Sequence, residues 1–298
     1  DRFYQVFDPS SDRVKVPYPV DQGEAYRQHL ADVRPQIGAL RQQLLRTLQA
    51  RDSRFWVHDR EEGQISSRRL YTLLSETNTK VFRQKQDLET QSVAVTLLVD
   101  LSSSMSGMKI RLARQVTVLF AETLHQLRFA SEVLGFSTSP SKPLRVLAQE
   151  SGLTESEIAD GYARYLPVEY TVFKAFREPL RRLKERIPDM ETAWYTPLNE
   201  AVLFAAKRII VRPESRKIIL VLTDGEPSIG NPRFQQVTES NLQHNLERIT
   251  QAGIECVAIG IQTDYVRNFF PDYVAVFDVA DLPKAFYKKF SVLLRITR

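Results

Sequence analysis

The sequence predicts an α/β fold, a doubly wound and mostly parallel sheet with helices on both faces. Two continuous apolar runs, VTLLV at residues 95–99 and KIILVLT at residues 217–223, have the length and composition of strands buried on both faces. Segments with helical spacing of apolar residues alternate with such runs, which is typical of parallel sheets with crossover helices. We expect this domain over residues 91–298, preceded by an extension over residues 1–90 that packs on it.

The extension contains a long amphipathic segment followed by short β-type segments. From residue 24 to residue 50 apolar side chains recur at steps of three and four, so the predicted helix has one packing stripe. Pro35 is expected to kink this helix or to split it in two. Residues 54–66 have the pattern of a hairpin, a short helix is expected over residues 67–74, and residues 81–82 are expected to be extended.

The main domain shows the alternation element by element. Helices are expected over residues 109–127, 169–187, 198–210, 238–252 and 282–294, and strands over residues 95–99, 132–136, 144–147, 217–223, 254–261 and 273–277. The strand at 144–147 is predicted to pair with that at 132–136 and to lie at the edge of the sheet. Residues 226–237 contain Pro, Gly and Asn and are expected to form a long loop at the sheet edge where strands 95–99 and 217–223 end.

The composition argues against a membrane protein and against a disulfide-bonded one. No stretch approaches the ~20 apolar residues that a membrane span requires. The single cysteine, Cys256, lies in an apolar run and is expected to be a buried structural residue rather than a reactive one. One cysteine excludes a disulfide within the chain, so we expect a soluble, cytoplasmic protein.

The chain is basic, with a formal net charge of +5 and an isoelectric point near 9.2. Its Lys and Arg residues are spread along the sequence rather than gathered in one block, so we do not expect a nucleic-acid-binding protein. An acidic partner is the expected functional use of this charge.

A short polar motif follows the first buried strand. Asp100, Ser102 and Ser104 form the pattern D-x-S-x-S at the carboxyl end of the strand, where open α/β sheets bind their ligands. One carboxylate and two hydroxyls are oxygen ligands of the kind that Mg²⁺ takes. The alternative is structural, because Asp and Ser also hydrogen-bond turns and cap the next helix.

Two distant segments favour the ion-binding interpretation. The second buried strand also ends in an acid, Asp224, and Gly225 then allows the backbone to turn sharply. Between the two strands, Thr196 stands just before a predicted helix and adds a third hydroxyl. If the carboxyl ends of both strands meet at one sheet edge, these side chains converge there.

The series Asp100, Ser102, Ser104, Thr196 and Asp224 resembles the metal-ion-dependent adhesion site (MIDAS) of von Willebrand factor A (VWA) domains, over residues 93–294. Four segments make the resemblance more specific: RFWVHDREEGQISSRRLYTLL, LGFSTSP, VRPESRKIILVLTDGEPS and AIGIQTDYVRNFFPDYVAVFDVADL. They are similar to the carboxyl-terminal half of the CobT family, subunits of the aerobic cobalt chelatase of cobalamin biosynthesis. The chain departs from that family in lacking the glycine of the usual DNSGSM turn and the long acidic tract upstream.

The resemblance implies a non-catalytic accessory subunit. The five residues would hold Mg²⁺ or another divalent cation and leave one position for an acidic side chain of a partner. The implied partners are a CobS-like AAA+ ATPase and a large CobN-like subunit that holds the tetrapyrrole and inserts Co²⁺. The sequence agrees, because it contains no G-x-x-x-x-G-K-[ST] phosphate loop, no G-x-S-x-G elbow and no Cys/His cluster.

Three other functions stay open at this stage. Relatives with the same kind of ion site serve other MoxR-type AAA+ systems that activate nitric oxide reductase or rubisco. A phosphatase-type enzyme also places an acid after a central strand, although Ser102 stands where such an enzyme would have its second acid. The domain could also be a scaffold with a vestigial ion site.

Overall fold

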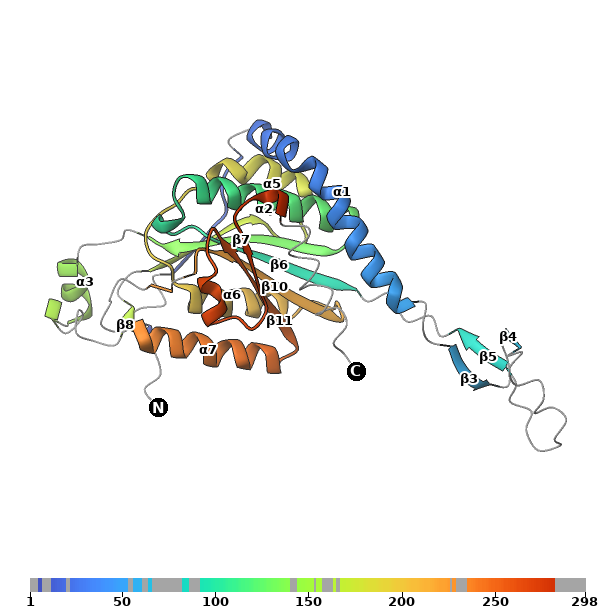
Figure 1. Ribbon diagram of the computed structural model, residues 1–298. Coiled ribbons are helices and arrows are strands. Elements are labelled where there is room, and N and C mark those ends of the chain that lie inside the picture. Colours follow the sequence, from blue (N-terminus) through green and yellow to red (C-terminus); the bar gives the residue numbers. More distant parts are fainter. Residues whose placement is uncertain are drawn as a thin grey trace.

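A seven-stranded β-sheet forms the centre of the fold in this computed structural model (Figure 1). The structure describes residues 5–6, 12–19, 22–52, 56–60, 64–65, 82–85, 92–139, 144–152, 154–156, 163–164, 167–225, 227–228 and 235–281. The sheet consists of β2 (Arg13–Lys15), β6 (Val93–Asp100), β7 (Ala130–Thr138), β9 (Val168–Lys174), β10 (Arg216–Thr223), β11 (Ile254–Ile261) and β12 (Tyr273–Val276). Their order is β12-β11-β10-β6-β7-β9-β2, and every neighbouring pair is parallel except β7 with β9.

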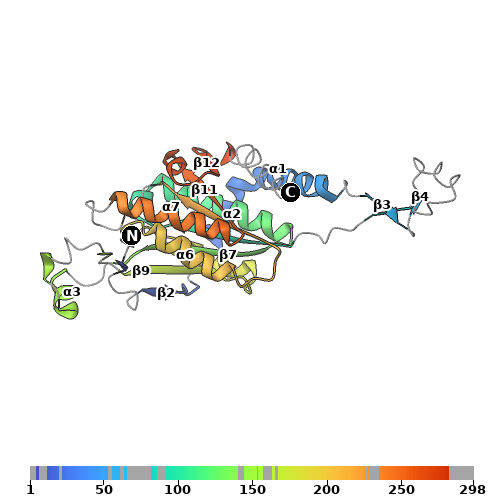
Figure 2. The ribbon, with the colours of Figure 1, turned by 90° about the horizontal axis from the view of Figure 1, so that it is seen from below.

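Helices cover both faces of this sheet. One face carries α1 (Glu24–Asp52), α2 (Met108–Gln126) and α5 (Leu180–Arg186), and the other carries α6 (Leu198–Ile209) and α7 (Gln235–Gln251) (Figures 1 and 2). The predicted class, a doubly wound and mostly parallel sheet with helices on both faces, is confirmed. None of the helices in the described part of the chain has both the length and the apolar character needed to cross a bilayer.

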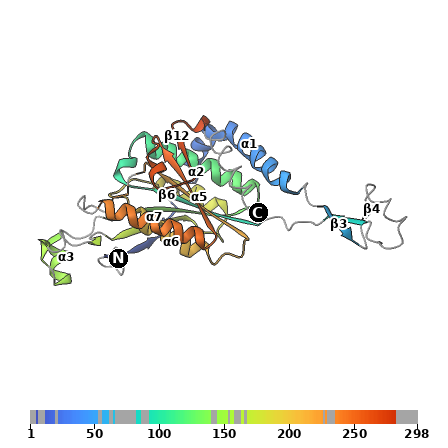
Figure 3. The same cartoon turned by 60° about the horizontal axis from the view of Figure 1, so that its bottom comes forward.

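The extension contributes both to the main domain and to a separate small sheet. β2 pairs with β9 at the edge of the main sheet, and α1 packs along α2 as one helix that Pro35 does not split. β3 (Trp56–Arg60), β5 (Phe82–Lys85) and β4 (Gln64–Ile65) form a sheet beyond the carboxyl end of α1 (Figure 3). Because β5 lies between β3 and β4, the predicted hairpin is wrong in its pairing.

Two expectations for the extension keep their status as predictions. The helix over residues 67–74 lies outside the described residues. The domain boundary at residue 90 also stays a prediction. β2 and α1 precede it in the chain and are packed on the main domain.

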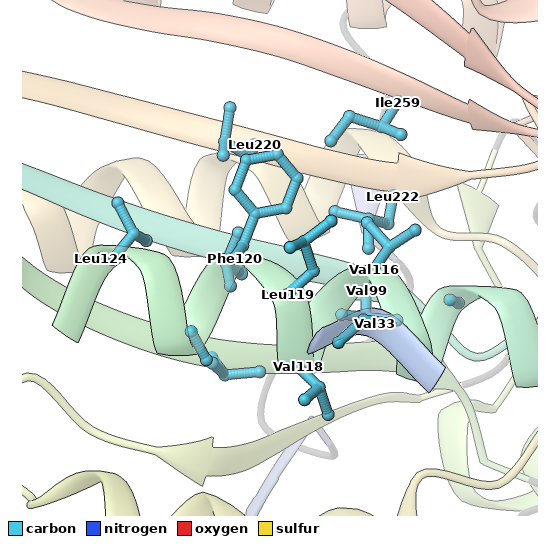
Figure 4. Packing of buried hydrophobic residues seen from close by; sticks show 14 of the residues in the cluster. Val33, Val99, Val116, Val118, Leu119, Phe120, Leu124, Leu220, Leu222 and Ile259 are labelled. Carbon is cyan, nitrogen blue, oxygen red and sulfur yellow. The ribbon is translucent and has the colours of Figure 1, made fainter. Parts of the chain in front are cut away.

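The packing of β6 explains its uninterrupted apolar sequence. All eight of its residues are buried, and successive side chains enter opposite faces of the sheet. Leu97 joins the core under α1 and α2, whereas Leu98 joins the core under α6 and α7. On the first face, Phe120 of α2 points toward Leu220 of β10, and Leu119 points toward Leu222 (Figure 4). A strand covered on both sides has no solvated face and therefore shows no polar alternation.

The region between β7 and α6 corrects two predictions. Residues 144–147 were expected to be an edge strand, but they begin the helix α3 (Leu144–Ser151). The partner of β7 is instead β9, which occupies the first part of the helix predicted over residues 169–187. Only α5 and the short turn that follows it are helical there.

The other predicted elements of the main domain fall at or near the expected positions, as α2, α6, α7, β6, β7, β10, β11 and β12. The closing helix over residues 282–294 lies outside the described residues. A parallel pair that the sequence did not indicate, β1 (Gln5–Val6) with β8 (Ala163–Arg164), forms a separate small sheet.

The chain leaves β6 for one face of the sheet and reaches β10 from the other. α2 follows β6 and leads to β7, whereas α6 on the opposite face leads into β10, the other neighbour of β6. Connections that diverge in this way leave a crevice at the carboxyl ends of the two strands, where ligands of open α/β sheets bind.

Candidate metal centre

Asp100 ends β6 inside this crevice and is fixed by two donors. Its side chain is completely buried. Oδ2 accepts a 2.6 Å hydrogen bond from Oγ1 of Thr223, the last residue of the neighbouring strand β10, and Oδ1 accepts a 2.8 Å bond from the backbone N–H of Ser102. Because both oxygens are held by the protein, the orientation of this carboxylate is set by the fold.

The environment of Asp100 disfavours its charge. Burial raises the pKa of the carboxyl group to about 7, and the nearby charge of Asp224 also raises it, against the lowering effect of the hydrogen bonds from Thr223 and Ser102. A cation beside the group would favour its ionised form. Asp100 is therefore a buried carboxylate whose ionised form would be stabilised by a cation bound next to it.

A series of hydrogen bonds joins the two serines to Asp224. Ser102 Oγ lies 3.0 Å from Ser104 Oγ, and Ser104 Oγ donates to Asp224 Oδ1 over 3.0 Å. The serines flank the start of a single helical turn, Ser103–Met105, that follows β6. Lys109, in the first turn of α2, donates to Asp224 Oδ2 over 2.8 Å. Side chains of the same chain thus engage both oxygens of Asp224.

Thr196 comes from the loop that leads into α6. Its side chain is 3% exposed and lines the same hollow as Ser102, Ser104 and Asp224. Its carbonyl oxygen accepts a 3.0 Å hydrogen bond from the backbone N–H of Ser228, in the segment that follows β10. The loop before α6 and the loop after β10 are therefore tied together at this residue.

The residues just before Thr196 are held between the ends of β6 and β7. The Ala193 N–H donates to the Leu101 carbonyl at 2.6 Å, and the Ser103 N–H donates to the Trp194 carbonyl at 2.9 Å. On the other side, the Trp194 N–H donates to Ser137 Oγ at 3.0 Å. Since both strand ends hold this loop, the Thr196 hydroxyl is positioned by a rigid support.

The hollow at this edge of the sheet has a volume of about 700 Å³. Four of the five predicted site residues line it, and Asp100 lies behind them, bonded to the Ser102 backbone. Two exposed aromatic residues form part of its wall beside the half-buried Tyr195, namely Trp194 with 48% of its surface exposed and Tyr265 with 36%. The remaining lining residues are Ser103, Lys109, Tyr195, Ser228, Gln235 and Thr263.

The donor set fits a hard divalent cation. Two carboxylates and three hydroxyls offer oxygen ligands only, as Mg²⁺ prefers. Within the described ranges no group of three or more His, Cys, Asp or Glu side chains is placed to hold a metal. Two buried or nearly buried acids, one of them with a raised pKa, match the charge of such an ion.

Several residues of this centre were not predicted from the sequence. Thr223 and Lys109 contact the two carboxylates, and Trp194 and Tyr265 shape the hollow. The signal for Thr223 was its hydroxyl at the last position of a strand that ends beside Asp100. The other three depend on how a helix and two loops are oriented, which apolar periodicity does not report.

Cys256 belongs to the core rather than to the centre. It lies on β11 and is partly buried among the residues beneath α6 and α7. Burial, together with the charge of Glu255, raises the pKa of its thiol to about 12. A thiol with that pKa is almost entirely protonated at neutral pH and is a poor nucleophile or metal ligand.

A known protein matches nearly the whole chain at low identity. In Bacillus subtilis the uncharacterized protein YojO is 22% identical over 295 residues, which cover 94% of this chain and 42% of that protein. This chain therefore spans less than half the length of that relative.

Among solved structures, BatB from Bacteroides thetaiotaomicron is 13% identical, with 68% of this chain and 100% of that chain covered and a TM-score of 0.44. The von Willebrand factor type A protein from Catenulispora acidiphila is 11% identical, with 70% and 43% covered and a TM-score of 0.40. The PilB minor pilin from Streptococcus sanguinis is 13% identical, with 72% and 65% covered and a TM-score of 0.43.

Sequence identities and TM-scores this low identify neither a function nor a family. The family is identified by the match of the sequence to a family model. The family model of the cobalamin biosynthesis protein CobT VWA domain matches residues 81–295, from β5 through the whole of the main sheet except β2. This match covers more than half of the chain and includes both strands that carry the acids of the centre. The chain belongs to the CobT VWA-domain family.

Proposed function

We propose that this chain is a non-catalytic subunit that docks to a AAA+ ATPase through a divalent cation, within an ATP-dependent cobalt chelatase of cobalamin biosynthesis. One observation carries the proposal. Two carboxylates and three hydroxyls converge where β6 and β10 end, beside an open hollow, in a domain of the CobT family.

In this proposal Asp100, Ser102, Ser104 and Thr196 hold Mg²⁺, and Asp224 coordinates it directly or through water. When bound, the ion supplies a Lewis-acidic position that an acidic side chain of the partner completes. The two carboxylates of this chain balance only the ion's own two charges, so the partner's carboxylate also needs hydrogen-bond donors nearby. Lys109, which lines the hollow, is one such donor.

The other residues of the centre act by positioning and by shape. The hydrogen bonds of the loop before α6 to both strand ends keep the Thr196 hydroxyl in place while a partner binds and leaves. Trp194 and Tyr265 offer exposed aromatic surface beside the polar floor, as protein interfaces often do. A partner residue with a carboxylate flanked by apolar groups suits this combination.

The partners follow from the family and are part of the proposal. A CobS-like ATPase would hydrolyse ATP, and a large CobN-like subunit would hold the tetrapyrrole and receive Co²⁺, which is the cargo and not the docking ion. The absence of a phosphate loop in the sequence supports a division of labour in which this chain transmits the ATPase cycle without hydrolysing ATP itself.

The test is capture of a purified CobS-like ATPase by the immobilised chain, with about 5 mM Mg²⁺ or with EDTA. The ATPase concentration is on the order of micromolar, which detects a complex with a micromolar Kd. We expect capture with Mg²⁺ and none with EDTA. Asp100→Ala should abolish capture while the circular dichroism spectrum stays unchanged. Asp32→Asn changes an acid of α1 that pairs with Arg111 of α2 and is not among the residues that line the hollow; it is the matched control and should bind like the unmodified chain.

Each contrary result has its own meaning. Equal capture in EDTA, or by the Asp100→Ala variant, would refute docking through the ion. Capture of a MoxR-type ATPase from another system but not of the CobS-like one would refute the chelatase assignment and leave ion-dependent docking intact. Hydrolysis of phosphate esters by the chain with Mg²⁺ would show instead that it is an enzyme.

A further inference from the structure

Lys109 occupies an unusual place among the charges of the centre. Its ammonium group lies 2.8 Å from Asp224 Oδ2, with 32% of the lysine side chain and 7% of the aspartate side chain exposed. The other oxygen of Asp224 accepts the hydrogen bond from Ser104. The Asp224 carboxylate is thus already neutralised by a positive charge from its own chain.

The backbone directs Lys109 to this place against the local electrostatics of its helix. Gly107 precedes α2 with a φ of +72°, a conformation that glycine adopts at little cost, and the helix then starts at Met108. A positive charge in the first turn of a helix is disfavoured by the helix dipole, and this turn contains no acidic residue. The ion pair with Asp224 offsets that disadvantage.

Resting on the proposed function, we infer that Lys109 is a built-in competitor for the cation at Asp224. The ammonium group has to leave Oδ2 whenever a divalent cation uses that oxygen, because two positive charges at one carboxylate oxygen repel each other. The lysine can leave, since its stem is flexible and the hollow beside it is open to solvent. Once released, it stands in the hollow where a partner's carboxylate enters.

This arrangement makes cation binding and partner binding depend on each other. A competitor in the same chain weakens the affinity of the centre for the ion alone. The released ammonium then favours the approach of an acidic side chain, which opposes its return to Asp224. The ion is consequently held best when the partner is present, so Lys109 acts as a positioning residue that discourages a filled centre without a partner.

Titration of the purified chain with MgCl₂ and with MnCl₂ by isothermal calorimetry tests the competition without any partner. We expect Lys109→Met to bind either ion at least about tenfold more tightly than the unmodified chain, since the ammonium no longer has to be displaced. Lys109→Gln should behave in the same way and serves if the methionine variant folds poorly. Lys109→Arg keeps the charge and should bind within about threefold of the unmodified chain.

Lys184→Met is the matched control. Lys184 forms an ion pair of similar exposure with Glu122, at 3.2 Å, on the face of the sheet covered by α2 and α5. Its replacement should leave the ion affinity unchanged.

Thermal unfolding gives a second readout. Without its ammonium partner Asp224 carries an uncompensated charge, so Lys109→Met should melt lower than the unmodified chain in EDTA. Because added Mg²⁺ stabilises the form that binds it more strongly, the increase of Tm with Mg²⁺ should be larger for this variant.

The outcomes separate this inference from the proposed function. Equal ion affinity of the unmodified chain and the Lys109→Met and Lys109→Gln variants would overturn the competition and leave ion-dependent docking standing. Weaker binding by these variants would also overturn it, because Lys109 would then support the ion. If neither the unmodified chain nor any of the Lys109 variants binds Mg²⁺ or Mn²⁺, both the inference and the proposed function are wrong.

Discussion

Replacing Asp100 by Asn should make the protein more stable at neutral and alkaline pH in the absence of divalent ions. The substitution keeps the shape of the side chain and removes a carboxyl group that is completely buried. The folded chain raises the pKa of this group from 3.8 to about 7, so the protonated form favours folding. The contribution of Asp100 to stability is therefore fully present below about pH 4 and is lost as the pH rises to about 7.

The size of the effect follows from the same shift. Between pH 5 and pH 8 the free energy of unfolding of the unmodified chain should fall by about 3 kcal/mol. About two pKa units of the shift, from 5 to about 7, lie in this interval, and each unit corresponds to about 1.36 kcal/mol. Asn does not titrate, so the variant does not lose this free energy. The difference in unfolding free energy between variant and unmodified chain should grow by about 3 kcal/mol over this interval.

Urea denaturation followed by circular dichroism, in EDTA at pH 5 and pH 8, measures this difference. Other titrating groups cancel because both proteins share them. Asp32→Asn removes an acid of which 42% is exposed and should show no comparable change. If the difference between Asp100→Asn and the unmodified chain is the same at both pH values, the burial argument for Asp100 is wrong. Added Mg²⁺ should stabilise the unmodified chain at pH 8 and not the variant.

Two further predictions concern residues beside the centre. Gly225→Ala should lower the unfolding free energy by about 1–3 kcal/mol, because Gly225 has a φ of +110° and a Cβ there would lie 3.1 Å from the Cβ of Tyr265; a urea midpoint equal to that of the unmodified chain would contradict this. Cys256 in the folded chain should react with a thiol reagent at pH 8 at least about 100-fold more slowly than in urea, because burial raises its pKa to about 12; equal rates would show that the thiol is accessible and ionised.

The sequence was sufficient to place the candidate centre because parallel strands end at one sheet edge. A buried apolar run followed by Asp100, and a second one followed by Asp224, had to bring these acids near each other if the strands were neighbours. The structure makes them neighbours and adds the hydrogen bonds through Ser104. The sequence pattern could not predict the contact of Lys109 with Asp224, because this contact depends on the direction in which α2 leaves the loop.

The segment from residue 144 to residue 187 shows where pattern reading fails. An apolar tetrad such as LRVL at residues 144–147 is compatible with a strand or a helix, and adjacency to β7 favoured the strand. On that side of β7 the actual partner is β9, which begins 30 residues after β7 ends and pairs in the antiparallel sense, with Phe136 opposite Tyr170. Aromatic and β-branched residues at 168–174 (VEYTVFK) were the available signal for this strand.

The prediction of a hairpin in the extension was wrong for a similar reason. Residues 56–60 and 64–65 are strands as expected, but the strand at 82–85 pairs with both and separates them. Sequence proximity favours direct pairing, and only the arrangement in space decides which strand takes the middle place.

β2 shields the last full-length strand of the main sheet. Three residues of β2 pair with β9, and the side chain of Asp12 accepts a 2.8 Å hydrogen bond from the Val168 N–H. A chain cut down to residues 91–298 would leave that row of backbone donors and acceptors bare along a sequence rich in β-branched and aromatic residues. Such an edge is a template for uncontrolled self-association. For this protein the small N-terminal strand is thus a safeguard against aggregation, and anyone isolating the domain should keep it.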